Sequence, residues 1–595
     1  MLASDQKNLV SMFFDQADTL GERPFLWAKR DGRYHPLSWR DVAARVSALA
    51  RGLRAMGVGR GDRIALVAEN GPDWVIADVA VMAAGGITVP AYTTNTAADH
   101  RHILTDSGAI GAIVSTRRLA TPVLEAASQS ASTRFVITIE QPHLEPGTDV
   151  EILSWEEVAA RGHEDHTNLV EDATKLARTD TACIIYTSGT TGAPKGVMLS
   201  HGAILHNCAG AYDALLELGL GDEVFLSFLP LSHSYEHTVG IYFPILIGAQ
   251  VYFAEGVETL AANMVEARPT IMTAVPRLYE ALHAKILRGV ERTGGIKEKL
   301  FRRAVSIGER RYRDPASLGL FGRIDDRILD RVVRDKVRAS FGGPLKALVS
   351  GGAPLNPEIG VFFTALGLRI LQGYGQTESG PVVSVNRPSG PKMHTVGPPL
   401  TDTEVRIAAD GEILIRGELV MQGYWGHEKE TGETVVDSWL HTGDIGEIDE
   451  DGHIVITDRK KDIIVNSGGD NISPARIEGL LTMEPEIAQA MVWGDKRPNL
   501  VALLVPDAEW MADWARSAGQ NADLSALAED ADFRKAVGEA VERVNGGLSL
   551  IEKVRRFTIA PEPFAIANEQ LTPTMKIRRH VLKKVYGERL EALYR

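Results

Sequence analysis

The amino-acid sequence predicts an α/β fold, because segments typical of strands and of helices alternate along most of the chain. The strand-like segments are short apolar runs, and two successive passes of the alternation predict two related α/β subdomains with largely parallel sheets. The expected strands cover residues 63–68, 87–90, 112–115, 224–229, 251–253, 271–274 and 345–350, and the clearest helices among them cover 72–84 and 240–247.

The pattern changes at about residue 381, where short alternating strands are separated by Gly/Asp turns. An Asp-Gly dipeptide between two alternating segments is a strong β-hairpin signal. The change therefore predicts a small β-rich, barrel-like subdomain over 381–457. Its clearest strands are 412–416, after Asp410-Gly411, and 453–456, after Asp451-Gly452.

A basic segment at 458–462 marks the expected boundary between two domains. Before it lies the long α/β pattern with its β-rich end, and after it a smaller α/β pattern continues. We therefore expect a large N-terminal domain at 1–457 and a smaller C-terminal domain at 458–595.

Composition limits the classes of function. The chain has 595 residues and a net charge of −14, which argues against binding nucleic acid through bulk charge. Cys183 and Cys208 are its two cysteines, so a disulfide framework is excluded. The first residues lack the pattern of a signal peptide, and no apolar run reaches the ~18 residues of a membrane span. We therefore expect a cytoplasmic protein.

A segment rich in glycine and hydroxyl side chains follows the apolar run 182–185 and ends at Lys195. Glycine lets the backbone fold around a ligand with its N–H groups turned inward, while hydroxyls and an ammonium add donors for phosphate oxygens. A Walker loop carries Ser or Thr directly after its lysine, whereas Gly196 follows here. The segment therefore predicts a nucleotide-phosphate loop of another kind. Its candidate residues are Thr187, Ser188, Gly189, Thr190, Thr191, Gly192 and Lys195.

Further motifs follow predicted strands. Gly-Tyr-Gly-Gln-Thr-Glu at 373–378 comes directly after a strand-like run at 368–371, and ligands collect at such strand ends in open α/β sheets. Its carboxylate, Glu378, offers the hard oxygen that Mg²⁺ prefers. Ser-Gly-Gly-Ala-Pro at 350–354 also ends a strand, and its glycines permit close backbone approach. Three more motifs are Leu-Pro-Leu-Ser-His at 229–233, His-Thr-Gly-Asp at 441–444 and Leu-Thr-Pro-Thr-Met-Lys at 571–576.

Taken in their order along the chain, these motifs resemble those of the adenylate-forming superfamily. The superfamily includes acyl-CoA synthetases, peptide-synthetase adenylation domains and luciferases. Such enzymes cut ATP between the α and β phosphates: a carboxylate attacks, pyrophosphate leaves and an acyl-adenylate forms. The segments 230–236 and 571–576, together with an insertion at 285–338, are similar to the long-chain fatty-acid–CoA ligases. The resemblance implies activation of long-chain fatty acids to acyl-CoA, with ATP, Mg²⁺ and coenzyme A.

The resemblance also implies roles for individual residues in nucleotide binding. It assigns Tyr374 to stacking on the adenine and Thr377 to a phosphate. Glu378, together with Thr190, is assigned to Mg²⁺. The turn with Gly351, Gly352 and Ala353 is assigned to the adenine and acyl pocket, and Gly373 and Gly375 belong to the adenine and magnesium motif.

Three more roles concern the ribose and the reacting groups. Asp444 is implied to accept hydrogen bonds from both ribose hydroxyls, with Arg459 assisting. His233 is implied to line the carboxylate site, and some fatty-acid members carry a gating Trp at the position of His237. Lys576 is the implied catalytic lysine, reaching the α phosphate and the substrate carboxylate. Because a fatty carboxylate is ionised at neutral pH, the reaction needs no general base. It needs positive groups that neutralise the negative charge of the reacting anions.

The second half-reaction is implied by a glycine-rich loop in the C-terminal domain. Ser467, Gly468 and Gly469 match the loop that lines the pantetheine tunnel of CoA ligases, and 458–462 matches the hinge about which the small domain swings. Two alternatives stay open. One is a fatty acyl-AMP ligase that passes the acyl group to a carrier protein, and the other is a non-catalytic lipid-binding or uptake protein.

The insertion at 285–338 has a strongly basic composition. It holds sixteen Lys/Arg and eight Asp/Glu, a balance of +8 in an acidic chain. We expect a solvated helical face. The alternative is a patch for anionic membrane surfaces, giving peripheral membrane contact, or for the phosphates of coenzyme A. Candidate apolar contacts there are Phe301, Tyr312, Leu318, Leu320 and Phe321.

Overall fold

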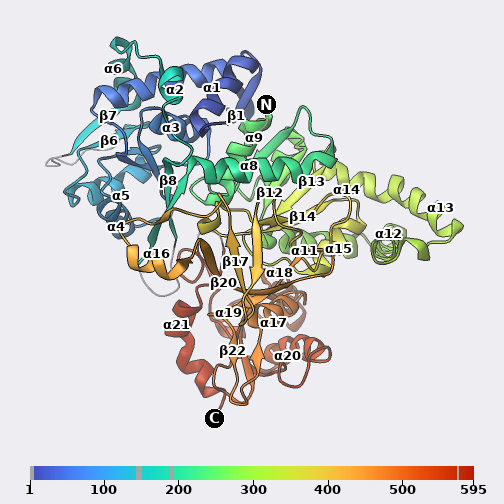
Figure 1. The fold of residues 1–595 in the computed structure, drawn as a ribbon. Helices are drawn as coiled ribbons and strands as arrows, with labels where there is room; N and C mark the ends of the chain where they lie inside the picture. Colours follow the sequence, from blue (N-terminus) through green and yellow to red (C-terminus); the bar gives the residue numbers. More distant parts are fainter. Residues whose placement is uncertain (1–5, 142–149, 188–192, 573–574) are drawn as a thin grey trace.

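The computed structural model describes residues 6–141, 150–187, 193–572 and 575–595. Two eight-stranded sheets, a five-stranded sheet and a C-terminal three-stranded sheet carry the fold, with helices around them. Figure 1 shows the large N-terminal part above and the C-terminal part, in orange and red, below it. The predicted α/β class is confirmed. Within the described ranges, no helix has the length and apolar character needed to cross a membrane.

The first large sheet has the strand order β18-β9-β8-β4-β3-β5-β6-β7. Its middle strands are parallel, whereas β8, β9 and β18 pair antiparallel at one end. The predicted strands of the first pass are confirmed here. The bounds are β3 Arg63–Val67, β4 Ile87–Pro90, β5 Gly111–Val114, β6 Phe135–Thr138, β7 Glu151–Ser154, β8 Thr181–Thr187, β9 Lys195–Ser200 and β18 Gly423–Tyr424, with helices α2 Trp39–Ala55, α3 Pro72–Ala83, α4 Ala97–Ser107 and α5 Arg117–Ser128.

The second large sheet has the order β15-β14-β13-β12-β10-β11-β1-β2. Strands β10 to β14 are parallel, as predicted for the second pass. The sequence did not indicate that β1 and β2, from the start of the chain, complete this sheet. The bounds are β1 Pro24–Arg30, β2 Arg33–Ser38, β10 Val224–Ser227, β11 Gln250–Phe253, β12 Ile271–Ala274, β13 Ala347–Ser350, β14 Ile370–Tyr374 and β15 Ser384–Val385.

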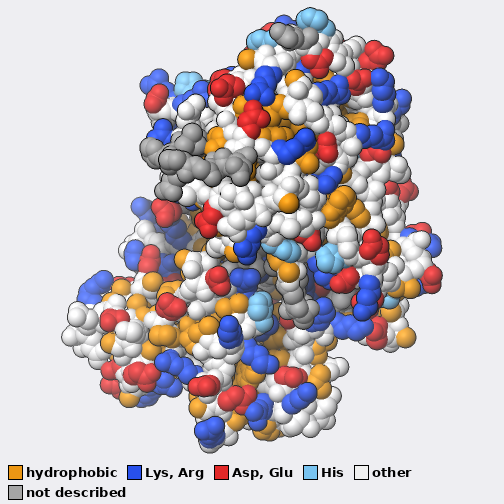
Figure 2. All heavy atoms as spheres, turned by 90° about the vertical axis from the view of Figure 1, so that its left-hand side faces the viewer, with side chains coloured by type: hydrophobic (Ala, Val, Ile, Leu, Met, Phe, Trp, Pro, Cys, Tyr) orange, Lys and Arg blue, Asp and Glu red, His pale blue; other side chains and the backbone are white. Residues whose placement is uncertain are grey.

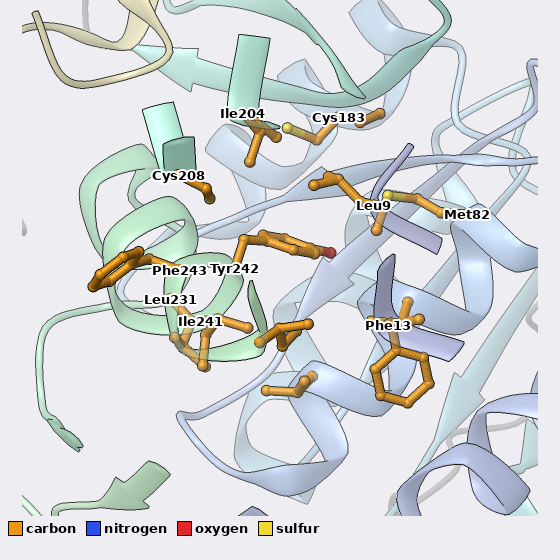
Figure 3. Close-up of a cluster of buried hydrophobic side chains, with 14 of the residues drawn as sticks. Leu9, Phe13, Met82, Cys183, Ile204, Cys208, Leu231, Ile241, Tyr242 and Phe243 are labelled. Carbon is orange, nitrogen blue, oxygen red and sulfur yellow. The ribbon is translucent and has the colours of Figure 1, made fainter. Parts of the chain in front are cut away.

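The main hydrophobic core includes residues of both large sheets and of the helices that pack on them. Figure 3 shows part of it. The helix predicted at 240–247 begins earlier, as a π-helical turn at Glu236–Tyr242 that continues into α9, Phe243–Ile247. Its side chains are buried all round, so no amphipathic period marks its start. The core also contains α1 Leu9–Leu20 and α8 His201–Leu215, and both cysteines are buried.

The β-rich subdomain is a five-stranded antiparallel sheet, in agreement with the prediction. Both predicted Asp-Gly turns close hairpins, and they need a residue with positive φ. Gly411 has φ +85° and Gly452 has φ +80°, a region that glycine enters without strain. The strands are β16 Glu404–Ile407, β17 Glu412–Arg416, β19 Val435–Val436, β20 Trp439–Ile448 and β21 Ile454–Arg459.

The C-terminal part has a hydrophobic core of its own. A three-stranded sheet is flanked by helices, and a short hairpin precedes it. The predicted domain start at 458 falls inside β21, so the division at this position stays a prediction. The elements are β22 Ile464–Val465, β23 Asn471–Ile472, β24 Ile487–Trp493, β25 Leu500–Pro506, β26 Val554–Ile559, α17 Pro474–Leu481, α18 Ala508–Ala518, α19 Leu524–Leu527, α20 Ala531–Asn545 and α21 Arg579–Ala592.

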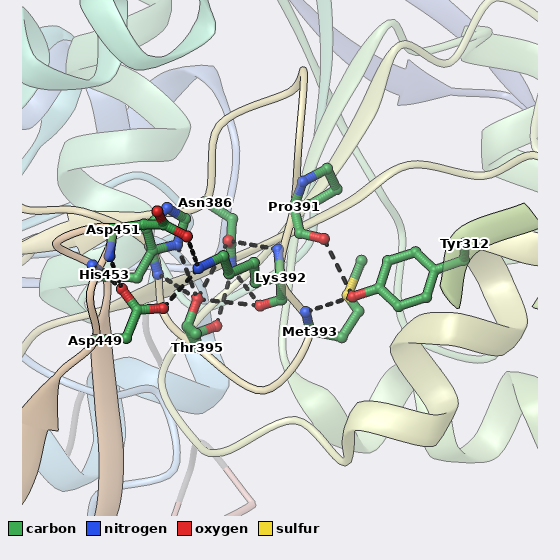
Figure 4. A network of polar contacts seen from close by, with 10 residues as sticks. Tyr312, Asn386, Pro391, Lys392, Met393, Thr395, Asp449, Asp451 and His453 are labelled. Carbon is green, nitrogen blue, oxygen red and sulfur yellow. Dashed lines mark hydrogen bonds and ion pairs between the residues drawn. The ribbon is translucent and has the colours of Figure 1, made fainter. Parts of the chain in front are cut away.

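The insertion between β12 and β13 is helical, as predicted, and projects from the edge of the molecule (Figure 1). It is anchored at Tyr312, whose hydroxyl donates to the carbonyl of Pro391 (3.2 Å) and accepts from the N–H of Met393 (2.9 Å). Between these two residues, Lys392 pairs with Asp449 and Asp451 (Figure 4). The helices are α11 Pro276–Thr293, α12 Gly295–Arg313, α13 Leu320–Leu329, a π-helical turn Asp330–Arg334 and α14 Asp335–Ser340.

The expected apolar contact residues of the insertion divide into two groups. Phe301 and Leu318 are buried and Tyr312 is anchored, so these three cannot contact a surface. Leu320 and Phe321 are exposed. The sequence pattern does not distinguish the groups, because burial depends on how each helix packs against the body of the protein.

Candidate active site

Two strands bring the ends of the predicted phosphate loop together. Thr187 ends β8 and Lys195 begins β9, and the two residues are register partners in this antiparallel pair. The remaining predicted loop residues, 188–192, lie outside the described residues, so their roles stay predictions. The ammonium of Lys195 is half-buried and lies 5.1 Å from the ring centre of Tyr424. This distance is short enough for a cation–π interaction, which orients the lysine toward the site.

Tyr424 links Lys195 to Glu378. It lies on β18, which pairs with β9, and its hydroxyl donates to Oε1 of Glu378 (3.0 Å). Burial, and then the Glu378 carboxylate, raise the pKa of the Tyr424 hydroxyl, so it stays a donor. The sequence analysis missed Tyr424, because its place depends on pairing between two segments far apart in the chain.

Tyr374, Asp444 and Arg459 form a second connected group. The Tyr374 hydroxyl donates to Oδ2 of Asp444 (2.7 Å), and Nε of Arg459 donates to Oδ1 (3.0 Å). Asp444 and Arg459 face each other across β20 and β21, and the backbone N–H of Asp444 is held by Thr442 (3.0 Å). Only 5% of the Asp444 side chain is exposed. Since each carboxylate oxygen has two lone pairs, Asp444 can accept further bonds from a ligand.

The Gly373–Glu378 motif turns sharply at the end of β14. A Cβ on Gly375 would lie 1.8 Å from the carbonyl oxygen of Pro381, so only glycine fits. The Thr377 hydroxyl lies 3.0 Å from that of Ser234, close to the His233 motif. This turn brings Thr377 and Glu378 out of the sheet edge into the site, as ligand binding at strand ends requires.

The Ser350–Pro354 turn meets the same region. A Cβ on Gly351 would lie 3.0 Å from the ring of Tyr235, whose hydroxyl donates to the carbonyl of Val349 (2.9 Å). The group that lies close to Gly351 is therefore the Tyr235 ring, whereas the sequence analysis expected a ligand there. Gly352 has φ +81°, and the roles of Gly352 and Ala353 in ligand binding stay predictions.

His233 is held as a neutral ring. Its Nδ1 accepts the backbone N–H of Tyr235 (3.2 Å), so the proton of the neutral ring is on Nε2. Burial, and then the Lys576 ammonium, lower the pKa of His233 to about 3. His233 is thus a hydrogen-bond donor without charge. His237, at the implied gate position, is fully buried instead, with Nε2 3.1 Å from Oδ2 of Asp78.

Lys576 reaches this group from the C-terminal part. It lies in a tight hairpin, where its N–H donates to Oγ1 of Thr572 (3.0 Å) and its carbonyl accepts the N–H of Thr572 (2.8 Å). Burial, and then Arg459, lower the pKa of the half-buried Lys576 to about 8, while Asp444 and Glu378 oppose the shift. The charges that act on Lys576 belong to predicted site residues, so the structure brings them together.

The C-terminal part is docked through α11 of the insertion. Arg277 donates to the carbonyl of Ala488 (3.0 Å), and Arg288 pairs with Asp507 (3.3 Å) and Glu509 (2.9 Å). These polar contacts keep Lys576 at the site. Arg292 also pairs with Glu509 (3.6 Å), Asn356 donates to the carbonyl of Gly479 (3.3 Å), and Met483 packs against an apolar cluster of the N-terminal part. The ion pairs are partly exposed, so each contributes little.

The predicted pantetheine loop is not brought to this group. Within it, Oδ1 of Asn466 accepts the N–H groups of Gly468 (2.8 Å) and Asp470 (2.9 Å). The N–H of Ser467 donates to the carbonyl of Arg497 (3.0 Å). Across the described ranges, the hydrogen bonds of 466–470 go to C-terminal residues. The CoA-binding role of Ser467, Gly468 and Gly469 stays a prediction.

The donor set fits Mg²⁺ bound together with phosphates. Among the described residues, no three His, Cys, Asp or Glu side chains gather as a complete metal cage. Glu378 offers a single half-buried carboxylate within the group described above. Mg²⁺ is commonly held by one or two carboxylates together with substrate phosphates, which agrees with this arrangement.

Fold and site together define a nucleotide-dependent, adenylate-forming type of enzyme, and the comparisons agree. Residues 13–425 match the AMP-binding enzyme family, and 461–595 match the AMP-binding enzyme C-terminal domain. The chain therefore belongs to the AMP-binding enzyme family.

Curated relatives cover nearly the whole chain. It is 35% identical over 600 residues to the long-chain-fatty-acid–CoA ligase FadD15 of Mycobacterium bovis, covering 99% of this chain and 97% of the relative. It is 30% identical to the peroxisomal long chain acyl-CoA synthetase 7 of Arabidopsis thaliana, covering 98% and 85%. The adenylation domain of the Segniliparus rugosus carboxylic acid reductase, solved with AMP and a co-purified carboxylic acid, has the same fold. Its TM-score is 0.78 at 23% identity, covering 100% of this chain and 95% of that one.

Proposed function

We propose that the protein activates long-chain fatty acids to acyl-CoA through an acyl-adenylate, using ATP and Mg²⁺ and releasing AMP and pyrophosphate. The observation that carries the proposal is the pair of connected groups, Tyr374–Asp444–Arg459 and Lys195–Tyr424–Glu378. The charges of Arg459, Asp444 and Glu378 also act on the pKa of Lys576. The full-length similarity to enzymes named long-chain-fatty-acid–CoA ligases supports the substrate class.

In the first half-reaction the fatty carboxylate attacks the α phosphorus of ATP. A new oxygen–phosphorus bond forms, and the bond to the leaving pyrophosphate breaks. Both reactants are anions, so the barrier falls when positive charge surrounds the transferring group. We propose that Lys576 and Lys195 supply part of that charge. Glu378 would hold Mg²⁺, which supplies further positive charge when bound.

Two groups orient the reactants. Asp444, fixed by Tyr374 and Arg459, accepts the ribose hydroxyls, and the fixed Tyr374 ring offers a face for the adenine. The Nε2–H of neutral His233 donates to the substrate carboxylate without adding a titrating charge near neutral pH. Such orientation reduces the entropy cost of bringing two molecules into line.

In the second half-reaction the thiol of coenzyme A attacks the acyl carbon. A sulfur–carbon bond forms, the carbon–oxygen bond to AMP breaks, and the thiol proton is released. We propose that the C-terminal domain, 458–595, turns relative to 1–457 about a hinge at 458–462, which withdraws Lys576 and brings Ser467 to Gly469 to the site. The separate C-terminal core and the few docking contacts support this motion.

The test of the function is a product analysis with palmitate, ATP and Mg²⁺, with and without coenzyme A. The proposal predicts AMP, pyrophosphate and palmitoyl-CoA in equal amounts when coenzyme A is present. Acyl-AMP released without consumption of coenzyme A supports a fatty acyl-AMP ligase instead. No nucleotide turnover with any acid from short to very long chains supports a non-catalytic lipid-binding protein.

We also propose that the enzyme makes peripheral contact with membranes through the insertion. Net positive charge alone does not carry this proposal, because many of the basic side chains there are paired with acids. The ion pairs include Arg302–Glu298, Arg303–Asp325, Arg311–Asp326, Arg313–Glu358, Arg334–Asp326 and Arg338–Asp330.

A further inference from the structure

Helix α13 of the insertion presents an apolar face to solvent. Phe321 is 86% exposed and Leu320 is 73% exposed, and three more large apolar residues follow at helical spacing. In a helix such spacing places side chains within one arc of the surface. A contiguous exposed apolar face on a monomer marks an interaction site, whereas single exposed apolar residues need no explanation. The face consists of Leu320, Phe321, Ile324 and Ile328 of α13, and it continues to Val332 in the π-helical turn that follows.

The opposite face of α13 is firmly packed. Leu329 is buried in a small cluster with Leu318, Ala304 and Ile307. At the end of α13 the fully buried Arg334 donates to the carbonyls of Ala365 (2.6 Å) and Ala304 (2.9 Å). The helix is therefore held by the body of the protein on its inner side. Its outer apolar side chains are exposed because of this packing, and no residue in the described ranges covers them.

The charges around α13 are sorted by side. Both of its acidic residues are paired: Asp325 with Arg303 of α12, and Asp326 with Arg311 of α12 and with Arg334. Asp330, which begins the π-helical turn after α13, is 44% exposed and pairs with Arg338 of α14. The arginines Arg323, Arg327 and Arg331 are exposed, four residues apart, beside the apolar face. Within the described part of the chain, Arg327 and Arg331 make no ion pair, and Arg323 donates to the carbonyl of Leu318 (3.2 Å). The outer side of α13 is therefore apolar and positive.

We propose that α13 docks on an anionic membrane surface, with Phe321 and its apolar neighbours among the acyl chains and the arginine row at the lipid phosphates. An amphipathic helix with aromatic and aliphatic side chains beside a basic row is suited to this interface. The proposal deepens the proposed function, since a long-chain acid partitions into membranes and a docked enzyme meets its substrate there.

The geometry favours a lipid surface over a second copy of this chain. The insertion projects from the edge of the molecule in Figure 1, so α13 is convex and offers a rigid partner little area. A two-fold dimer through α13 would also bring two arginine rows together, which costs energy. Figure 2 draws another face of the molecule, because α13 lies at the right-hand edge of Figure 1 and is turned away. On the face drawn there, basic and acidic side chains are interspersed.

The test is co-sedimentation of the full chain with phosphatidylcholine vesicles, with and without phosphatidylglycerol, in the absence of substrates. Phe321→Gln/Ile324→Gln is expected to weaken binding to anionic vesicles about a hundredfold, because two apolar side chains no longer leave water. Arg327→Gln/Arg331→Gln is expected to weaken it roughly tenfold and to reduce its dependence on salt. Matched controls far from α13 are Leu550→Gln/Ile551→Gln and Lys535→Gln/Arg555→Gln, which leave binding unchanged.

A second measurement does not depend on loss of binding. Both native cysteines are buried, so Phe321→Cys accepts an environment-sensitive fluorophore selectively. Its emission is expected to shift to the blue with anionic vesicles, while the same label at Leu550→Cys does not shift. Three results overturn the proposal: no vesicle binding by the parent chain, unchanged binding by both α13 variants, or a dimer that the Phe321→Gln/Ile324→Gln variant dissociates. Acyl-CoA formation from acid in detergent-free solution is assayed separately, so failure of the function is distinguishable from failure of docking.

Discussion

The two parts of the site are held in different ways. In the N-terminal part, Tyr374 donates a hydrogen bond to Asp444, and Tyr424 connects Lys195 to Glu378. Arg459, in the predicted hinge, donates to Asp444 as well. In the C-terminal part, Lys576 comes from a hairpin whose domain is docked through a few partly exposed polar contacts. The part proposed to bind the nucleotide is thus preorganised, whereas Lys576, the proposed catalytic lysine, is brought to the site by docking.

This difference predicts that substitutions can change nucleotide binding and the adenylation step separately. Variants in the connected N-terminal group are expected to change nucleotide affinity, because they disturb a fixed receptor. Variants of Lys576 or of the docking contacts are expected to change the adenylation step while leaving ATP affinity and thioester formation largely intact. The predictions below test this separation, from the largest expected effect to the smallest.

Lys576→Ala is expected to cost about 3 kcal/mol in the adenylation half-reaction, a loss of roughly a hundredfold or more, because one positive group at the transferring phosphate is removed. Thioester formation from preformed acyl-adenylate is expected to survive. Both half-reactions are measured separately by pyrophosphate release and by acyl-CoA formation. Lys584→Ala, an exposed lysine on α21, is the control and leaves both unchanged. Equal loss in the two half-reactions contradicts the assignment.

Asp444→Asn tests the preorganised part. The amide replaces one carboxylate oxygen by a donor and removes the charge that holds Arg459, so the KM for ATP is expected to rise about tenfold or more. The rate of thioester formation from supplied acyl-adenylate is affected less. Asp437→Asn, an exposed acid of the same subdomain, is the matched control. An unchanged KM for ATP would remove Asp444 from the nucleotide site.

The pH dependence of adenylation follows from Lys576. Burial lowers its pKa to about 8, so the ammonium is present below this pH and is lost above it. The kcat/KM for adenylation is therefore expected to fall about tenfold per pH unit above pH 8. Lys576→Arg is expected to be slower but to lose this fall, because a guanidinium stays charged. His233, with a pKa of about 3, contributes no step between pH 5 and 8. If kcat/KM still falls above pH 8 in Lys576→Arg, another titrating group causes the fall.

The smallest expected effect concerns docking. Arg288→Ala removes two partly exposed ion pairs between α11 and α18, which weakens adenylation by about two- to fivefold. The KM for ATP and the thioester step stay as in the parent. Arg302→Ala, whose partners lie inside the insertion, is the control. A higher KM for ATP in Arg288→Ala would mean that docking and nucleotide binding are not separable.

The sequence predicts much of the fold because strands and turns carry local signals. The apolar runs of the two sheets and the Asp-Gly hairpins were placed correctly, since burial and positive φ select residue types locally. Residue types suited to phosphate and Mg²⁺ also pointed to motifs at strand ends, while the roles of their residues came from the family resemblance and stay predictions. Tyr424 was missed, because it reaches Glu378 only through the pairing of β18 with β9. The burial of Leu318 and the exposure of Phe321 also depend on packing between distant segments.

The most direct measurement of the central claim follows the oxygen of the acid. Palmitate labelled with ¹⁸O in its carboxylate is turned over with ATP, Mg²⁺ and coenzyme A, and the products are weighed by mass spectrometry. Attack of the carboxylate on the α phosphorus predicts AMP that carries one labelled oxygen, palmitoyl-CoA that keeps the other in its carbonyl, and unlabelled pyrophosphate. Formation of ADP, with the label in orthophosphate, would contradict the account.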